Sequence, residues 1–319
     1  YYALLKKAVR NAGFPQVPVL SINPVGKAAK KAQPGFTLVN GPLLKRLVAA
    51  VCLGDLLDRV TLTTRPYEKI PGSTNRLYET YVEKGIHLMK DFSFQKYKAL
   101  VREIVAAFTR LEIVPEKKPK VGIVGEILVK YHPYANNQMI DVIEEEGGEA
   151  VVTDLLDFFL YSLFNQQIKA KYFGKSQLKA ILGKAAIQIL EMFRNPVRDA
   201  LIASGRFTPP LTIDEIAEKA VKFVSLGNQM GEGWLLPGEI GELIDRGVEN
   251  VVCLQPFGCL PNHVIGRGVF NAVKKVYPEA NLIAIDYDAS ISKVNQLNRI
   301  KLMLNVAKEK LNAGETITV

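Results

Sequence analysis

The first third of the chain carries apolar residues at the three- and four-residue spacing of amphipathic helices. Residues 1–12 predict one helix, and residues 43–59 predict a second whose apolar positions face a core. A longer helical pattern runs from Asn75 to Ile113, with a break expected near Phe92 and Ser93. The segments between are predicted as a short strand and two loops rich in breaking residues, at 17–20, 23–42 and 65–73.

From residue 116 the pattern changes to strands that alternate with helices. Residues 120–129 are β-branched and almost continuously apolar, which is typical of a parallel strand covered on both faces. Thr212 and Glu215 have the spacing of a capping box. Further strands are expected at 150–153, 250–254 and 281–286, and helices at 136–148, 155–172, 175–194, 213–226, 239–247, 263–276 and 292–312. This alternation predicts a parallel sheet with right-handed crossovers.

Two parts are therefore predicted. Residues 116–319 are expected to form a doubly wound α/β domain. Residues 1–115 are interpreted as the remainder of a truncated upstream α/β domain, plus helices that pack between the two. Since the first residues have the pattern of a helix already under way, we expect further chain before Tyr1.

Charge and composition narrow the function classes. The net charge is +9, but Lys and Arg are spread along helices and mixed with Glu. That distribution favours a solvated surface over a nucleic-acid interface, and it also suits an anionic ligand such as a nucleotide or CoA. No apolar run approaches the ~20 residues of a membrane span. Three cysteines are too few for a disulfide framework, so a reducing cytoplasm is the expected compartment.

The carboxyl ends of the predicted strands select the candidate site, because ligands of open parallel sheets bind there. Glu126 follows the first strand, where a carboxylate acts as acid, base or substrate anchor, or else caps a neighbouring helix. Asn136 and Asn137 open a predicted helix, and capping explains at least one of them. The same edge, with a glycine-rich turn at 227–234, also offers Gln255, Gly258, Glu232, Asp286 and Asp288.

Two of the three cysteines lie in one stretch, at residues 253–263. Cys259 follows a glycine and precedes a predicted helix, whose N-terminus favours thiolate over thiol. Cys253 lies within an apolar strand, where a metal ligand and a buried core residue are equally good interpretations. Cys52 is expected to be core, and His263 to cap or hydrogen-bond a loop. Two cysteines separated by five residues do not make a closed zinc site.

Two nucleotide-binding motifs are missing from the sequence. The first predicted strand is not followed by the G-x-G-x-x-G of dinucleotide-binding folds. The sequence also lacks a G-x-x-x-x-G-K-[ST] segment of the P-loop type. No ATP site is therefore predicted in this chain.

Four segments together resemble one family: residues 121–137, 227–234, 253–263 and 285–304. The family is the activase-related branch of the 2-hydroxyacyl-CoA dehydratase and benzoyl-CoA reductase superfamily. The N-terminal stretch and R-P-Y-E-K at 65–69 are similar too, so the resemblance covers nearly the whole chain. The blocks P-F-G-C-L-P-N and N-Q-L-N-R are its most specific parts.

The resemblance implies flavodoxin-like α/β domains that hold a 4Fe–4S or related iron–sulfur cluster between them. It also implies low-potential electrons from an ATP-hydrolysing activase, fused or separate, and reductive or radical chemistry on a CoA thioester. A homo- or hetero-dimer is expected. By carry-over, Cys259 is the best cluster ligand and Cys253 the second, with further ligands upstream of this chain.

Other functions stay open at this point. The rim residues Gln255, Gly258, Asn137 and Glu232 are expected near the cluster or substrate, with Glu126 as the candidate catalytic group. The same rim would also suit a cluster-free module that binds CoA or a nucleotide. A regulatory domain that docks on an ATPase is the third interpretation.

Overall fold

The structure is a computed structural model that describes the chain except residues 1, 20–40, 289, 291 and 317–319, with side chains described as far as residue 313. The chain falls into two compact units, Tyr1–Val48 and Ala49–Val319. The first contains helix α1 (Tyr2–Asn11), as predicted. Of the short strand expected at 17–20, residues 17–19 are not in a strand, and residue 20 lies outside the described residues. Most of the loop expected at 23–42 also lies outside them.

A four-stranded parallel sheet organises the second unit. Its strands are β1 (Lys120–Gly125), β2 (Glu149–Val152), β3 (Asn250–Pro256) and β4 (Asn281–Tyr287). They lie in the order β2-β1-β3-β4, and each neighbouring pair is parallel. The chain therefore winds outward from β1 to β2 on one side and from β3 to β4 on the other, which confirms the predicted doubly wound α/β fold.

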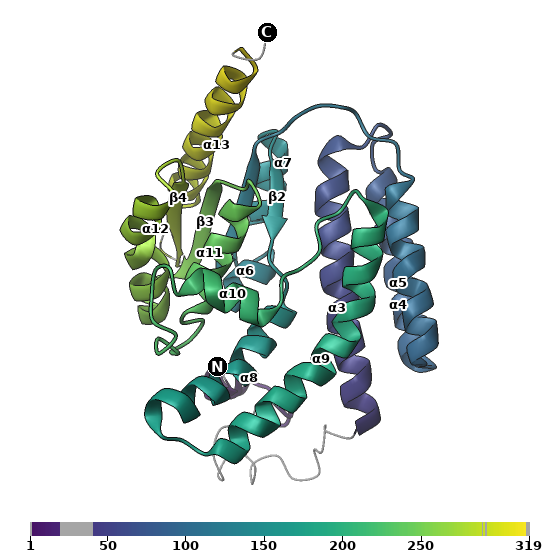
Figure 1. The fold of residues 1–319 in the computed structure, drawn as a ribbon, viewed down its shortest axis with the longest axis vertical. Helices are drawn as coiled ribbons and strands as arrows, with labels where there is room; N and C mark the ends of the chain where they lie inside the picture. The colour runs from purple at the N-terminus through teal and green to yellow at the C-terminus, as the bar shows by residue number, and fades with distance from the viewer. Residues whose placement is uncertain (1, 20–40, 289, 291, 317–319) are drawn as a thin grey trace. The chain divides into compact units, whose positions relative to one another are not determined.

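Helices cover both faces of this sheet (Figure 1). Ile123 and Val252 point to a core shared with α7 and α13, whereas Val124 and Val251 point to a core shared with α11 and α12. Because successive side chains alternate between two buried faces, the strands are apolar at almost every position. The covering helices are α7 (Met139–Glu145), α13 (Lys293–Thr316), α11 (Leu235–Asp245) and α12 (Phe270–Val276).

A helical layer lies beside the β2 edge of the sheet (Figure 1). Tyr97 of α5 stacks among Phe92, Phe94 and Phe193, and its hydroxyl donates to the carbonyl of Phe193 at 2.7 Å. The helices beside this edge are α3 (Gly41–Thr64), α4 (Ser73–Lys90), α5 (Phe94–Thr109) and α9 (Gln177–Ser204), with the short η1 (Arg65–Tyr67). Helix α8 (Leu156–Phe173) packs against α9, and α10 (Ile213–Ala220) packs against α11. The break expected near Phe92 is confirmed between α4 and α5.

Several helices and strands begin or end a few residues away from their predicted positions. The capping box of Thr212 and Glu215 is confirmed, with both side-chain-to-backbone bonds present. In contrast, β1 ends at Gly125 rather than at residue 129, because the chain turns there into the short helix α6 (Ile127–Tyr131). The expected domain boundary at 115/116 stays a prediction. The helices of residues 49–115 belong to the same compact unit as the sheet, which agrees with their expected role as packing helices.

A buried ionic cluster, made of Asp55, Arg59, Asp154, Asp157 and Arg194, ties α3 and α9 to the end of β2. Arg59 pairs with Asp154, and Arg194 bridges Asp154 at 2.9 Å and Asp157 at 2.8 Å. Asp55 accepts from the backbone N–H groups of residues 155 and 156, at 2.9 and 3.0 Å. Fully ionised, three carboxylates and two guanidinium groups would leave one negative charge buried.

That surplus charge sets the protonation of the cluster. Despite its burial, Asp154 has a pKa lowered to about 2 by Arg59 and Arg194. Burial and the charge of Asp154 raise the pKa of Asp55 well above its usual range. Burial likewise raises the pKa of Asp157 to about 7. The folded cluster thus holds a proton that the unfolded chain releases at lower pH.

We expect Asp157 to make the protein less stable as pH rises from about 4 to 7. In this window the folded state binds more protons than the unfolded state, so the free energy of unfolding falls with pH. Asp157→Asn should remove this component, measured as the difference between urea-unfolding curves of variant and wild type across the window. Asp199→Asn, at an exposed position of α9, is the control. A pH-independent difference would contradict the assignment.

Candidate functional site

The carboxyl ends of β1 and β3 lie side by side where the winding direction of the sheet reverses. Gly125 pairs with Leu254, and the N–H of Glu126 donates to the carbonyl of Leu254 at 2.9 Å. In doubly wound sheets this reversal opens the crevice in which ligands bind. The structure therefore brings the loops after β1 and β3 together at the predicted edge.

A tight turn presents Cys259 at this edge. The N–H of Cys259 donates to the carbonyl of Pro256 at 3.1 Å, which closes a β-turn. Gly258 is the third residue of that turn, with φ +73°, a conformation that favours glycine there. Helical structure follows directly, first as the π-helical turn η2 (Asn262–Gly266) and then as η3 (Arg267–Val269) and α12. Cys259 thus precedes a helical segment, as predicted, and a π-turn of this kind is frequent at functional sites.

Asn262 connects the Cys259 thiol to a buried carboxylate. Its amide nitrogen donates to Cys259 Sγ at 3.2 Å and to Glu232 Oε2 at 3.0 Å, which uses both of its hydrogens. Asn262 and Glu232 are both buried, while Cys259 is partly exposed. The amide oxygen of Asn262 is buried without a partner among the described residues. The arrangement orients one thiol and supplies a hydrogen bond to its sulfur.

A second polar group lies behind the turn. Gln255 is fully buried, and its amide nitrogen donates to Asp286 Oδ1 at 2.7 Å. The same nitrogen lies 3.3 Å from His263 Nε2, and His263 Nδ1 lies 2.9 Å from the carbonyl of Cys259. Because the carbonyl of Cys259 can only accept, Nδ1 donates to it, and Nε2 also lies 3.3 Å from Asp286 Oδ1. His263 therefore hydrogen-bonds its loop, as expected, and fixes the backbone of Cys259.

Glu126 is a helix cap, which is one of the roles that the sequence left open. Its side chain caps α6 by accepting from the N–H of Val129 at 2.9 Å. Partial burial raises its pKa, the N–H of Val129 opposes this rise, and the charge of Glu232 adds to it. Glu126 is thus a structural cap whose carboxyl holds a proton more readily than an exposed one.

Asn137 is engaged away from the thiol. It has φ +55°, and its amide nitrogen donates to Gln296 of α13 at 2.7 Å. Asn136 is buried and accepts from the N–H of Met139 at 3.1 Å, but the residue before α7 is Gln138, so the helix begins later than predicted and neither asparagine occupies the cap position. Asp288 accepts from the N–H of Ser290 at 2.7 Å, as a local cap does. Asn137 stays a predicted rim residue, but its contacts tie β4 and α13 to the loop that precedes α7.

The other two cysteines are core residues in their packing. Cys253 is 0 % exposed and lies in the apolar cluster between the sheet, α11 and α12, and burial raises the pKa of its thiol. Cys52 is also buried, and burial raises the pKa of its thiol to about 12. Because a metal ligand must be a thiolate, the packing of Cys253 favours the core interpretation over the ligand one.

The described residues test how a cluster would be held. They contain no group of three His, Cys, Asp or Glu side chains placed to bind a metal ion. Cys259 alone combines partial exposure with a position at the crevice.

Exposed apolar side chains, called the apolar rim below, occur in the loop of Cys259 and in the glycine-rich turn that contacts it. The exposed large side chains next to Cys259, in its own loop and in the glycine-rich turn, are Phe257, Leu260, Val264 and Met230. The two loops touch, since a Cβ added at Gly231 would lie 2.9 Å from the side chain of Pro261. Exposed apolar side chains grouped in this way are typical of a surface that another protein segment covers.

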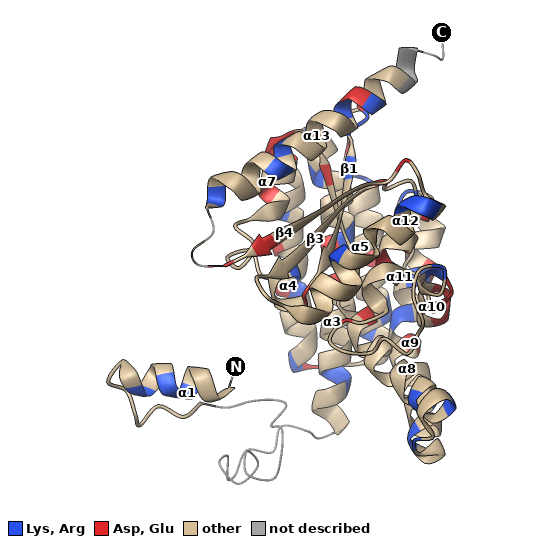
Figure 2. Cartoon of the chain, turned by 90° about the vertical axis from the view of Figure 1, so that its left-hand side faces the viewer, with Lys and Arg blue, Asp and Glu red and all other residues tan. Residues whose placement is uncertain are grey.

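Sequence reasoning gave no role to Asn262 or to its pairing with Glu232. A signal was present, because residues 259, 262 and 263 have the i, i+3, i+4 spacing that places side chains on one helical face. The helix was expected to begin at residue 263, which hid that spacing. Figure 2 shows residues of both charges on α13, where Lys and Arg are the more frequent.

Comparison of the chain with family models, curated proteins and solved structures yields no match. The family resemblance therefore stays a prediction. Among the helices described, none is long and apolar enough to cross a membrane.

Proposed function

We propose that this chain is the iron–sulfur component of a system like the 2-hydroxyacyl-CoA dehydratases and benzoyl-CoA reductases. It would accept low-potential electrons from an ATP-hydrolysing activase and use them for reductive or radical chemistry on a CoA thioester. The observation that carries the proposal is Cys259, a partly exposed thiol at the switch point of the sheet with a hydrogen-bond donor on its sulfur.

The environment of Cys259 suits a cluster ligand. A helical segment follows it, and the amide of Asn262 donates a hydrogen bond to its sulfur. Hydrogen bonds to the sulfurs also help to set the reduction potential of a bound cluster. When bound, the cluster would supply the electron. The role of this chain is to hold and orient one thiolate, and the apolar rim suits the protein segment that would bring the other ligands.

The fold supports a finer assignment. The order β2-β1-β3-β4 matches the first four strands of the flavodoxin-like order 2-1-3-4-5, so we assign the sheet to that class. Gln255, Gly258 and Glu232 shape the crevice around the thiol, and Glu126 is the candidate proton donor at its edge. Cys253 is a weaker ligand candidate because of its burial. A cytoplasmic location and a dimer, with a fused or separate activase, complete the proposal.

Iron analysis of the full-length protein, isolated without oxygen, tests the Cys259 assignment. We expect Cys259→Ala to lose most of its iron, sulfide and visible absorbance. The substitution removes one thiolate ligand, so this loop no longer binds the cluster. Cys52→Ala is the matched control, since Cys52 is buried away from the crevice and should leave the iron content unchanged. Full iron in Cys259→Ala would show that the assignment is wrong.

The same preparation separates the cluster from the cluster-free alternative. Colourless wild-type protein whose melting temperature rises with CoA or a nucleotide would instead support a binding module. Colourless protein that co-purifies with an ATPase, without such a ligand, would favour a docking domain.

A further inference from the structure

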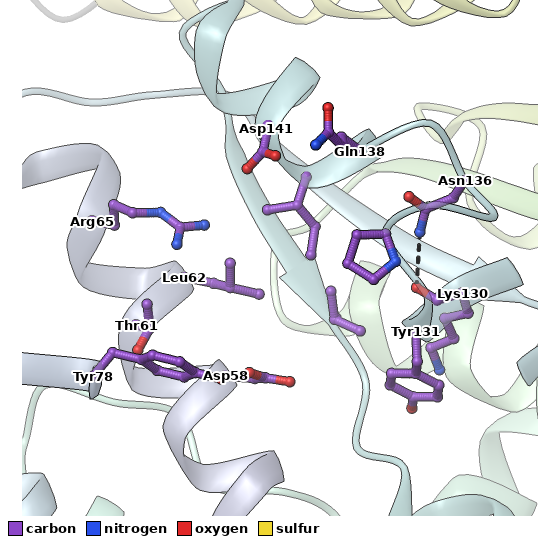
Figure 3. Close-up of a pocket in the computed structure, with 13 residues that line it drawn as sticks. Asp58, Thr61, Leu62, Arg65, Tyr78, Lys130, Tyr131, Asn136, Gln138 and Asp141 are labelled. Atoms are coloured by element: carbon purple, nitrogen blue, oxygen red, sulfur yellow. Dashed lines mark hydrogen bonds between the residues drawn. The ribbon is translucent and has the colours of Figure 1, made fainter. Parts of the chain in front are cut away.

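A separate pocket opens between the helical layer and the β2 side of the sheet (Figure 3). Its volume is about 370 Å³, within the usual range for small-molecule sites. Its walls come from α3, η1, α4, α6, the loop from α6 to α7, α7 and the end of β2, all within the second compact unit. No residue of the Cys259 crevice lines it.

Three unpaired oxygen groups gather at one end of this pocket. Asp58 and Thr61 come from α3, and Tyr78 comes from α4 (Figure 3). Thr61 is only 3 % exposed, and its hydroxyl has no partner among the described residues. Asp58 is exposed and Tyr78 partly exposed, and neither forms a hydrogen bond or ion pair within the described part of the chain, so Thr61 is the buried group of the three. A buried hydroxyl without a partner is costly, which indicates that a donor group completes this end.

The pKa of the Asp58 carboxyl is shifted by its surroundings, although solvent reaches the group through the pocket. Protein packed around it and the charge of Asp154 raise its pKa to about 6, while Arg65 opposes the rise. Asp58 is an exposed residue, so at neutral pH it is mostly an anion, and a cation bound beside it would neutralise this charge.

The cations that line the pocket are already neutralised. Arg65 donates to both carboxylate oxygens of Glu144, at 2.7 and 2.9 Å, and to Asn75 at 3.2 Å. Lys130 is buried in a pair with Glu239 at 2.9 Å. Counted together with Glu144 and Glu239, the lining carries an excess of two carboxylates, those of Asp58 and Asp141, although the charge of Arg65 also acts on both of them. Such a lining repels phosphates and carboxylates.

The two acidic ends are separated by apolar walls. In Figure 3, Asp58 and Asp141 lie at opposite ends of the set of residues drawn, and Leu62 lies between them. The apolar lining residues are Leu62, Pro133, Ile140 and Val152. An extended aliphatic chain with a positive charge at each end would match both the charges and the walls.

We propose that this pocket binds a small aliphatic diamine, with one ammonium group at Asp58, Thr61 and Tyr78 and the other at Asp141. The first ammonium group donates to the Asp58 carboxylate and the Thr61 hydroxyl, and it lies by the ring of Tyr78. The methylene chain packs on the apolar walls. The proposal does not depend on the iron–sulfur assignment.

Calorimetric titration of the full chain at pH 8 tests the proposal, with diamines of three to six carbons as probes. We expect one of them to bind at least about tenfold more tightly than the monoamine of equal length, because only a diamine reaches both carboxylates. The dicarboxylate of similar length should not bind. Absence of any diamine binding, or equal affinity for monoamine and diamine, would overturn the proposal.

Two variants test which carboxylate binds each ammonium group of the diamine. Asp58→Asn should weaken diamine and monoamine alike by about tenfold or more, whereas Asp141→Asn should weaken only the diamine. Glu83→Gln, at an exposed position of α4 outside the pocket, is the matched control and should leave both affinities unchanged. Circular dichroism and an unchanged melting temperature exclude misfolding as the cause. Unaltered affinity in Asp58→Asn would reject Asp58 as the counter-ion.

Discussion

Arg194→Met should lower the free energy of unfolding by about 3–5 kcal/mol, the cost of breaking a buried ion pair on one side. Arg194 is 2 % exposed and bridges Asp154 and Asp157. Methionine keeps much of the side-chain volume, so the loss comes from two buried carboxylates that share only the remaining charge of Arg59. Urea unfolding at pH 8, where this deficit is largest, measures the effect.

Two further variants separate charge from packing. Arg102→Met, at an exposed position of α5, should change the free energy of unfolding by no more than about 0.5 kcal/mol. Adding Asp157→Asn to Arg194→Met should restore at least about 1 kcal/mol, because it removes one of the stranded carboxylates. Equal losses in the single and double variants, or a loss below 1 kcal/mol in Arg194→Met, would show that the bridge contributes little.

The alternation of strands and helices could be predicted because each side of the sheet is buried. Period-two burial on two faces makes β1 and β3 continuously apolar, and period-three-and-four spacing marks the helices. The end of β1 could not be predicted in this way. Val129 is buried on α6, so it is as apolar as a strand residue, and the turn at Glu126 depends on contacts with β3.

The order of strands and helices predicted where the candidate site lies, but not which residues are hydrogen-bonded to one another there. The strand-end rule located Cys259, Gln255 and Glu126, since it needs only the order of elements. The Asn262–Glu232 pair joins residues 30 positions apart, and hydropathy carries no information about such pairs. The same limit hid the buried ionic cluster, because Asp154 and Arg194 have the same letters whether buried or solvated.

Gly125→Ala, which adds one methyl group at the switch point, should strongly lower the free energy of unfolding. Gly125 has φ +140°, and an added Cβ would lie 2.0 Å from the carbonyl oxygen of Leu254, which is part of the β1–β3 ladder. Neither backbone can yield without breaking parallel pairing. Strain and lost pairing together should cost at least about 3 kcal/mol of the free energy of unfolding, measured by urea unfolding.

Gly54→Ala is the control of opposite sign. Gly54 is exposed within α3, and nothing lies within 4 Å of an added Cβ there, so alanine should stabilise the helix by about 0.5–1 kcal/mol. Equal stability of Gly125→Ala and wild type would mean that the strand ends tolerate separation. If they separate, the bond from Glu126 N–H to Leu254 is lost and the crevice edge opens. In Gly125→Ala, the fraction of iron that is lost is then compared with the fraction of protein that is unfolded. A larger loss of iron would show that the close approach of β1 and β3 positions Cys259.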